Sequence, residues 1–181
     1  SADLANHVFD TIASRAEDHP LQLCGLHALD SCRIEKAFRH FGHDISNEDH
    51  VLEAGLGFAV KETKPEGRFG SMIGCDAVKA KRNDGLSQRL MQFRLKDPDP
   101  LLYHNEAILR DGELVGYLTS GNYGHHLAGA VGLGYVKCGV AGESAQDQLN
   151  SSYSIDIAGK IIEAEVSFEP MYDPKAVQVR L

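Results

Sequence analysis

The chain has 181 residues, of which 43% are hydrophobic and 24% are charged, as in an ordinary globular protein of one domain or two small lobes. The 18 Lys and Arg residues against 26 Asp and Glu residues give a net charge of −8. This balance argues against a nucleic-acid partner, because phosphate contacts need clustered cations. No apolar run is long enough to span a membrane, and residues 1–15 do not read as a signal peptide.

The cysteines are far apart in the sequence and show no metal-ligand spacing. They are Cys24, Cys32, Cys75 and Cys138. We expect four reduced thiols in a reducing compartment rather than a zinc site or a disulfide framework.

The spacing of apolar residues predicts a helix-bearing α+β first half. The expected elements are a helix over 2–15, a short strand over 22–24, a helix over 26–41, a strand over 57–61 and a helix over 74–82. Gly42 should end the second helix, on whose exposed face Glu35 and Arg39 are placed for an ion pair. Residues 62–68 read as a turn-rich break, and residues 83–85 as the turn that stops the third helix.

The second half, from about residue 85, reads as all-β. The expected strands are 89–95, with one buried face, and then 107–109, 114–119, 130–137, 153–157 and 161–168. Hairpin turns are expected at 111–112 and 159–160. The predicted fold class is therefore α+β: a helix-bearing half, residues 1–84, followed by a small antiparallel β-barrel or sandwich, residues 85–181.

One long motif carries a resemblance to a known family. Its members, in order, are Gly25, Ala28, Asp30, Arg33, Ile34, Glu35, Gly42, Asp44, Ile45, Glu53, Ala54, Gly55, Leu56 and Phe58. This run resembles the aminomethyltransferase, or glycine-cleavage T-protein, family. Further matches downstream are Ile73, Gly74, Ala77, Gly112, Gly116, Thr119, Ser120, Gly121 and residues 169–174. The amino-acid sequence of the motif resembles dimethylglycine and sarcosine dehydrogenases more closely than the free T-protein.

The resemblance implies a tetrahydrofolate-binding region that accepts a one-carbon unit from a small N-methyl amine and yields methylene-tetrahydrofolate. Residues 1–84 would be the C-terminal part of the folate-binding α+β region, and residues 85–181 the C-terminal barrel. FAD would belong to a separate upstream domain or subunit, since Gly132 and Gly134 lie in a β-rich region and open no dinucleotide-binding helix. The implied compartment is a bacterial cytoplasm or the mitochondrial matrix.

The same resemblance suggests that the catalytic carboxylate and a pterin-binding Glu precede the motif, so that the chain alone is expected to be incomplete as an enzyme. Two alternatives remain open at this point. One is folate-dependent demethylation of a sulfur or oxygen substrate. The other is a non-catalytic folate-binding or regulatory module.

Three residues are candidate folate contacts. Phe58 takes the place of an aromatic residue that contacts folate in relatives, and its ring could either stack on a pterin or pack in a core. Arg33 could hold a carboxylate of the folate tail, or could form an internal ion pair with Asp30 or Glu53. Tyr172 lies near the end of the chain, where some relatives place a Tyr over the folate.

Other chemistry-bearing residues receive structural expectations. Leu29 stands where the family has a folate-contacting Arg, which weakens anion binding at this point. Glu53 is expected to be a structural carboxylate, and Ser120 to lie in a tight turn rather than to act as a nucleophile. The histidines expected to be solvated or hydrogen-bonded, and not metal ligands, are His40, His43, His125 and His126. No catalytic residue is assigned to the chain.

Overall fold

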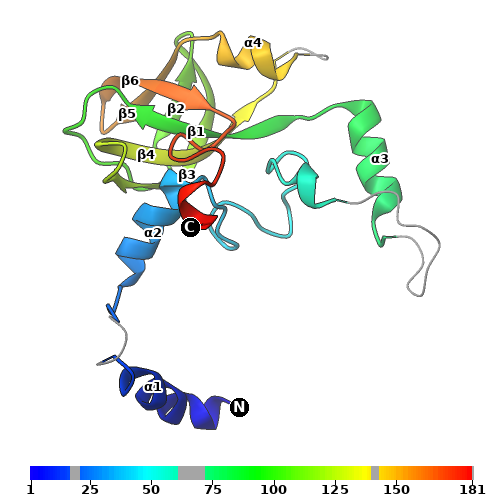
Figure 1. Ribbon diagram of the computed structural model, residues 1–181. Coiled ribbons are helices and arrows are strands. Elements are labelled where there is room, and N and C mark those ends of the chain that lie inside the picture. The colour runs from blue at the N-terminus through cyan, green and yellow to red at the C-terminus, as the bar shows by residue number, and fades with distance from the viewer. Residues whose placement is uncertain (17–20, 61–71, 140–142, 181) are drawn as a thin grey trace.

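The computed structural model describes residues 1–16, 21–60, 72–139 and 143–180. Its helices and helical turns are η1 (Ala2–Leu4), α1 (Ala5–Ala13), α2 (Leu26–Glu35), η2 (Gly57–Ala59), α3 (Cys75–Asp84), α4 (Ala145–Leu149) and η3 (Gln178–Arg180). Its strands are β1 (Gln88–Leu95), β2 (Ala107–Arg110), β3 (Glu113–Gly124), β4 (Gly129–Lys137), β5 (Tyr153–Ile157) and β6 (Lys160–Ser167). The predicted α+β class is confirmed. The strands gather in one body, and α1, α2 and α3 lie outside it (Figure 1).

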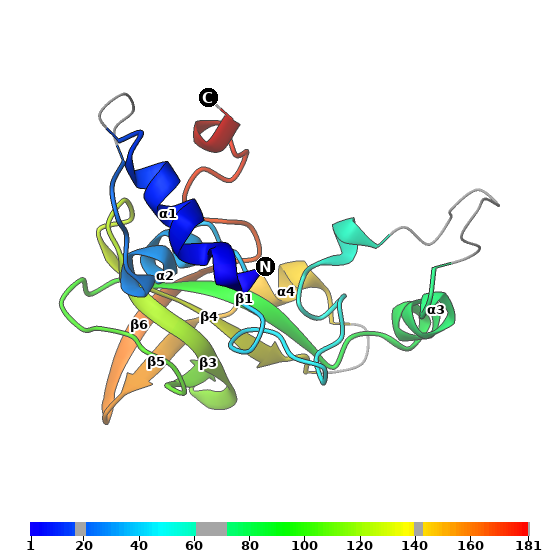
Figure 2. The same ribbon diagram turned by 90° about the horizontal axis from the view of Figure 1, so that it is seen from below.

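The strands β1–β6 close into a barrel in the order β1-β4-β3-β2-β5-β6, with every neighbouring pair antiparallel. Closure comes from β1, which pairs with β4 on one side and with β6 on the other, for example at Phe93 and Val166. Of the two architectures left open by the sequence, the barrel is therefore the one observed. Helix α2 lies against the barrel, where it contacts β3 and β4, and α1 stands apart from the barrel in Figure 1. Figure 2 shows the same arrangement from below, so that α1 overlaps the barrel in that view.

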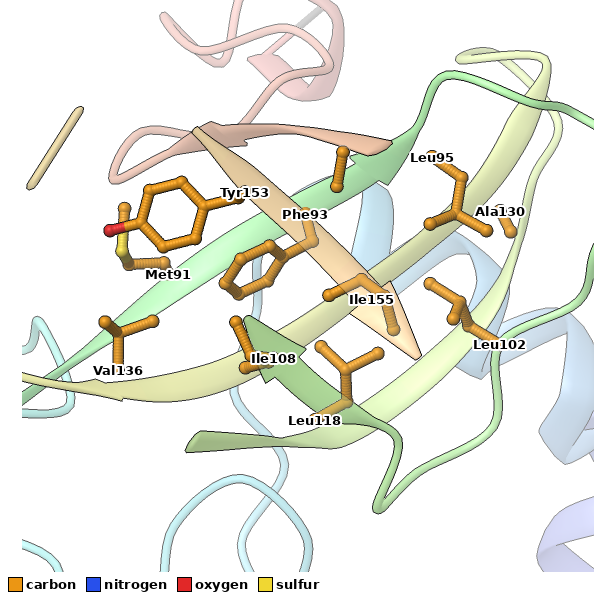
Figure 3. Packing of buried hydrophobic residues seen from close by; sticks show 11 residues of the cluster. Met91, Phe93, Leu95, Leu102, Ile108, Leu118, Ala130, Val136, Tyr153 and Ile155 are labelled. Carbon is orange, nitrogen blue, oxygen red and sulfur yellow. The ribbon is translucent and has the colours of Figure 1, made fainter. Parts of the chain in front are cut away.

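Alternate residues of the strands point into the barrel and form its core (Figure 3). The largest of the fully buried side chains is Phe93, which meets Tyr153 edge-on with ring centroids 5.9 Å apart. Two glycines of β4 give the neighbouring side chains room, because a Cβ on Gly132 would meet Leu118 and one on Gly134 would meet Ile108. The alternation of apolar residues along the strands thus supplies the side chains that fill the barrel interior.

The prediction that β1 has a single buried face is wrong. Its outward-facing residues Leu90 and Gln92 are also buried, at 3% and 1% exposure, because α2 and the chain after it cover this side of the barrel. Gln92 Nε2 donates to the carbonyl of Ile34 at 2.7 Å and to that of Glu35 at 3.1 Å. Its Oε1 accepts from the backbone N–H of Met171 at 2.7 Å. One amide therefore joins the barrel, α2 and the C-terminal segment.

Helix α2 ends six residues earlier than predicted, at Glu35 rather than at 41. Ala37 has a φ of 51°, a left-handed conformation that cannot continue an α-helix. The expected ion pair between Glu35 and Arg39 is also wrong. Glu35 is buried, and Arg39 donates instead to the carbonyls of Ala37 and Ala54.

The helices over 2–15 and 74–82, the strands of the second half and the hairpin turn at 111–112 are confirmed, with β3 extending to Gly124. The second hairpin turn is formed by residues 158–159, one residue earlier than predicted. The strand over 22–24 is wrong, since these residues form no regular element, and the strand over 57–61 is wrong, since Gly57–Ala59 form the helical turn η2. The break over 62–68 lies outside the described residues. The short helix α4, with a complete capping box between Ser144 and Asp147, was not anticipated.

None of the helices that the structure describes is long and apolar enough to pass through a membrane.

Candidate functional site

The family motif centres on a cluster of ion pairs at the end of α2. Arg33 Nε contacts Asp30 Oδ1 at 2.6 Å, and its Nη1 contacts Asp44 Oδ2 at 2.7 Å. The same guanidinium donates to the carbonyl of Phe38 at 3.2 Å and, through Nη2, to Ser120 Oγ at 2.9 Å. The Asp44 side chain is fully buried, and that of Arg33 is only 10% exposed. Nearly all the N–H donors of the guanidinium are therefore used in hydrogen bonds within the protein.

A bulge in β3 brings the barrel to this cluster. The pairing of β3 with β4 shifts register between Leu118 and Ser120. Consecutive strand residues normally face opposite sides, but here Thr119 Oγ1 donates to Asp44 at 2.5 Å while Ser120 Oγ accepts from Arg33. The expectation of a tight turn at Ser120 is wrong, because the residue lies within β3. Its hydroxyl has a structural partner.

A cleft of about 460 Å³ lies beside this cluster, between α2 and the barrel. Asp30 and Arg33 contribute charged groups to its lining, and Leu101, Tyr103 and Tyr123 contribute apolar surface. A volume of this size suits a small organic molecule. Arg33 lines this cleft, whereas Phe58 and Tyr172 do not, so the structure does not bring the three sequence-predicted residues together around one cavity.

Phe58 lies on η2 and its side chain is 86% exposed, among the most exposed large apolar residues of the described chain. It is neither on a strand nor in a core, and its ring is open to a partner. Gly55, with a φ of 70°, and the turn at Leu56 lead the chain into η2. Arg39 holds this turn by donating to the carbonyl of Ala54 at 2.9 Å.

Tyr172 contacts protein groups on several sides. Its ring stacks on His126 with centroids 4.2 Å apart and an interplanar angle of 25°, and Lys36 Nζ lies 5.8 Å from its centroid. Its backbone N–H donates to the carbonyl of Glu35 at 3.4 Å. His126 in turn places Nδ1 3.0 Å from Glu35 Oε2. The C-terminal segment is thereby fastened to the end of α2.

Glu53 behaves as the structural carboxylate that was expected. It pairs with Lys81 of α3 at 2.7 Å and accepts from both the backbone N–H and the hydroxyl of Ser87. Burial opposes its ionisation, but the hydrogen bonds from Lys81 and Ser87 outweigh that effect and lower its pKa to about 2. The carboxylate thus ties the motif to α3 and to the start of β1.

Histidine side chains in the described part of the chain contact one another or an aromatic ring and form no metal site. Within residues 1–16, 21–60, 72–139 and 143–180, no group of three or more His, Cys, Asp or Glu side chains could hold a metal ion. His40 and His43 stack on each other with centroids 4.5 Å apart, and His125 meets Tyr123 edge-on. The structural roles of Asp44 and Glu35 were not predicted from the sequence, although both residues belong to the family motif and this membership was the available signal.

Comparison with known proteins gives two matches along the chain. Residues 1–64 match the family described as the GCVT N-terminal domain, and residues 88–173 match the glycine cleavage T-protein C-terminal barrel domain. In fold, the chain is similar to the crystal structure of glycine cleavage system aminomethyltransferase T from Bartonella henselae, with a TM-score of 0.75 and 23% identity. That similarity covers 91% of this chain and 44% of the solved one.

Two curated relatives are similar over almost all of the chain. A 4-methylaminobutanoate oxidase (formaldehyde-forming) from Paenarthrobacter nicotinovorans is 38% identical over 180 residues, which are 99% of this chain and 20% of that protein. The mitochondrial sarcosine dehydrogenase of Homo sapiens is 29% identical over 174 residues, which are 96% of this chain and 18% of that protein. The chain thus spans about a fifth of the length of these relatives.

Proposed function

Because the chain belongs to the glycine cleavage T-protein family, we propose that it is the tetrahydrofolate-binding portion of a one-carbon transfer enzyme. The donor we propose is a small N-methyl amine, and the product methylene-tetrahydrofolate. The names of the oxidase and dehydrogenase relatives support this donor class, since both act on N-methylated amino acids. A flavin domain or subunit would oxidise the amine, in a bacterial cytoplasm or a mitochondrial matrix.

The observation that carries the proposal is the exposed ring of Phe58. A large aromatic side chain left 86% open on an ordered helical turn invites a flat apolar partner, and a pterin or benzoyl ring is such a partner. The residues present therefore fit the aromatic part of a folate at this position. Tetrahydrofolate would supply the nucleophilic nitrogen that takes up the one-carbon unit.

The chain's own contribution to the reaction would be orientation. Phe58 would hold the ligand's ring in a fixed plane, and such positioning supplies a large part of the acceleration in reactions between two bound partners. Arg33 would act indirectly, by fixing α2 through its contacts with Asp30 and Asp44. Tyr172, stacked on His126, would fix the C-terminal segment against the end of α2. We expect the acid–base group from outside these residues.

A second candidate function is supported by the name of one relative. An oxidase described as formaldehyde-forming releases the one-carbon unit as formaldehyde. A chain of this kind could bind folate without completing the transfer, as a binding or regulatory module. Demethylation of a sulfur or oxygen substrate would instead give methyl-tetrahydrofolate, and we rank it below the other two because none of the relatives described above is named for it.

The test is a product analysis of the full-length protein with an N-methyl amine donor, with and without tetrahydrofolate. Methylene-tetrahydrofolate formed at the expense of formaldehyde supports the transfer function. Formaldehyde alone, together with measurable folate binding by titration calorimetry, supports the binding module. An absence of folate binding in the titration would refute both.

A further inference from the structure

The cleft between α2 and the barrel has two walls that are held together by hydrogen bonds and close packing. One wall is α2, and the other is β3 with the loop at 101–104, which contribute the rings of Tyr123 and Tyr103. Ser31 Oγ donates to the carbonyl of Tyr123 at 2.6 Å and so fixes α2 on β3. A Cβ on Gly121 would lie 2.8 Å from the backbone nitrogen of Tyr103, which shows how closely the loop packs on the strand. Both tyrosines therefore lie on walls whose backbones are fixed.

The formal charges around this cleft do not balance. Arg33 is shared between two carboxylates, those of Asp30 and Asp44. A third carboxylate, that of Glu106, accepts the backbone N–H of Tyr103 at 2.9 Å through Oε1. Its Oε2 is buried without a hydrogen-bond partner among the described residues, none of which forms a salt bridge with it. A buried carboxylate oxygen without a partner is costly, so the surroundings of the cleft favour a cation.

Asp30 is the carboxylate that a ligand in the cleft could reach. Its side chain is 31% exposed, whereas that of Asp44 is fully buried. Its Oδ1 accepts from Arg33 Nε at 2.6 Å, and its Oδ2 has no hydrogen-bond partner in the described part of the chain. The same cleft presents two tyrosine rings. An acid beside aromatic rings is suited to a methylated ammonium ion, because the ring faces attract the positive charge that the methyl groups carry.

We propose that this cleft binds a small methylated ammonium ion, with Asp30 as the counter-charge and with Tyr103 and Tyr123 against the methyl groups. The volume of about 460 Å³ suits a free small molecule. The site is separate from Phe58, which does not line the cleft, and the inference holds whether or not the protein binds folate. Three imidazole rings also line the cleft, those of His27, His43 and His104. Histidine ordinarily takes up a proton at about pH 6.5, so a cation should bind best above that pH.

The test compares the binding of choline and of its uncharged carbon isostere, 3,3-dimethylbutan-1-ol, to the full-length protein. Titration calorimetry is carried out at about pH 8, where histidine is ordinarily neutral. The two probes have the same shape, so the difference between their affinities reports the charge. The wild type should bind choline about tenfold more tightly than the isostere, as expected for a cation held by ring faces and a carboxylate.

The variants locate the site. Tyr103→Leu keeps apolar surface but removes the ring, and should weaken choline binding about fivefold while leaving the isostere almost unaffected. Tyr103→Phe keeps the ring face and should bind choline as the wild type does. Tyr117→Leu, the same change at a 52% exposed tyrosine of β3 outside the cleft lining, is the matched control and should have no effect. Asp30→Asn should bring the affinities for the two probes close together.

Three results would overturn the proposal. The first is a wild-type protein that does not bind choline or binds it no better than the isostere. The second is an unchanged choline affinity in Tyr103→Leu, which would place the choline site elsewhere in the protein. The third is a preference for choline that persists in Asp30→Asn, provided that the melting temperature shows the variant to be folded. If that variant does not fold, the two Tyr103 variants decide. A parallel folate titration tests the proposed function separately.

Discussion

Arg33 and Asp44 are eleven residues apart in sequence and form a 2.7 Å ion pair whose acid is fully buried. The pair is joined to the barrel through Thr119 and Ser120, on the two sides of a strand bulge. The pair is therefore one of several contacts that join the family motif to the barrel, together with those of Gln92 to the carbonyls of Ile34 and Glu35.

Replacement of Asp44 by Asn should lower the free energy of unfolding by about 1.5–3 kcal/mol, because it removes the fully buried counter-charge of Arg33 and leaves the partly exposed Asp30 to balance the guanidinium. Arg33→Lys should also destabilise, since an ammonium cannot reproduce a fork that contacts four groups. Chemical denaturation followed by circular dichroism measures both effects. Lys96→Met, which breaks the solvent-exposed pair with Glu163, is the control and should change little. Equal effects of the buried and exposed changes would contradict the argument.

Gly116→Ala should destabilise the barrel by about 1–3 kcal/mol, because overpacking of a close contact forces the backbone apart. A Cβ at this position would overlap the carbonyl oxygen of Tyr135 on the neighbouring strand. Gly129→Ala is the matched control in the same sheet, since its Cβ would find its nearest neighbour, the Leu95 carbonyl oxygen, at 3.6 Å. Thermal melts of both variants make the comparison. A neutral Gly116→Ala would show that β3 and β4 can separate without cost.

The depressed pKa of Glu53 predicts an acid-sensitive contribution to stability. Its folded-state pKa, about 2, lies below the ordinary value of 4.5, so the unfolded chain takes up the proton first as pH falls. The stabilisation is present above pH 4.5 and is lost as pH falls from there toward 2. Glu53→Gln should therefore be less stable than the wild type at pH 6, and the difference should shrink toward pH 2. A difference that stays constant over this range would contradict the assignment.

Phe58→Ala should leave the melting temperature almost unchanged while weakening folate binding. The ring is 86% exposed, so its removal opens no cavity, whereas a lost stacking contact is worth about 0.5–1.5 kcal/mol beyond the area that it buries. Titration calorimetry with tetrahydrofolate measures the affinity. Phe9→Ala, on the exposed surface of α1, is the control for removal of an exposed aromatic ring. Equal folate affinity in both variants would remove the support that Phe58 gives to the proposed function.

The barrel could be predicted from the sequence because its cause is local. Apolar residues alternate along each strand, and the turns carry Asp-Gly or Gly at left-handed positions such as Asp111, Gly112 and Gly159. A local signal also predicted the end of α3, because Gly85, with a φ of 89°, follows its last residue, Asp84. The capping box of Ser144 and Asp147 is an equally local signal, so α4 was within reach of sequence analysis.

The errors fall where distant contacts decide the local structure. The sequence around Ala37 does not predict a left-handed residue. Helix α2 ends before it because side chains bind the backbone carbonyls there: Arg33 binds that of Phe38, and Gln92 binds those of Ile34 and Glu35. Residues 57–61 look like a strand in the sequence, but Gly57–Ala59 form the helical turn η2, which pairs with no strand among the described residues and leaves Phe58 exposed.

The buried amide of Gln92 has a consequence for how the molecule loses order. Its nitrogen donates to two carbonyls at the end of α2, and its oxygen accepts from the backbone N–H of Met171. Opening of either segment would therefore leave a buried polar group without a hydrogen-bond partner. Segments more than fifty residues away from Gln92 on one side and nearly eighty on the other are thus made to melt together. The segment around Met171 should therefore share the slow amide exchange of the barrel.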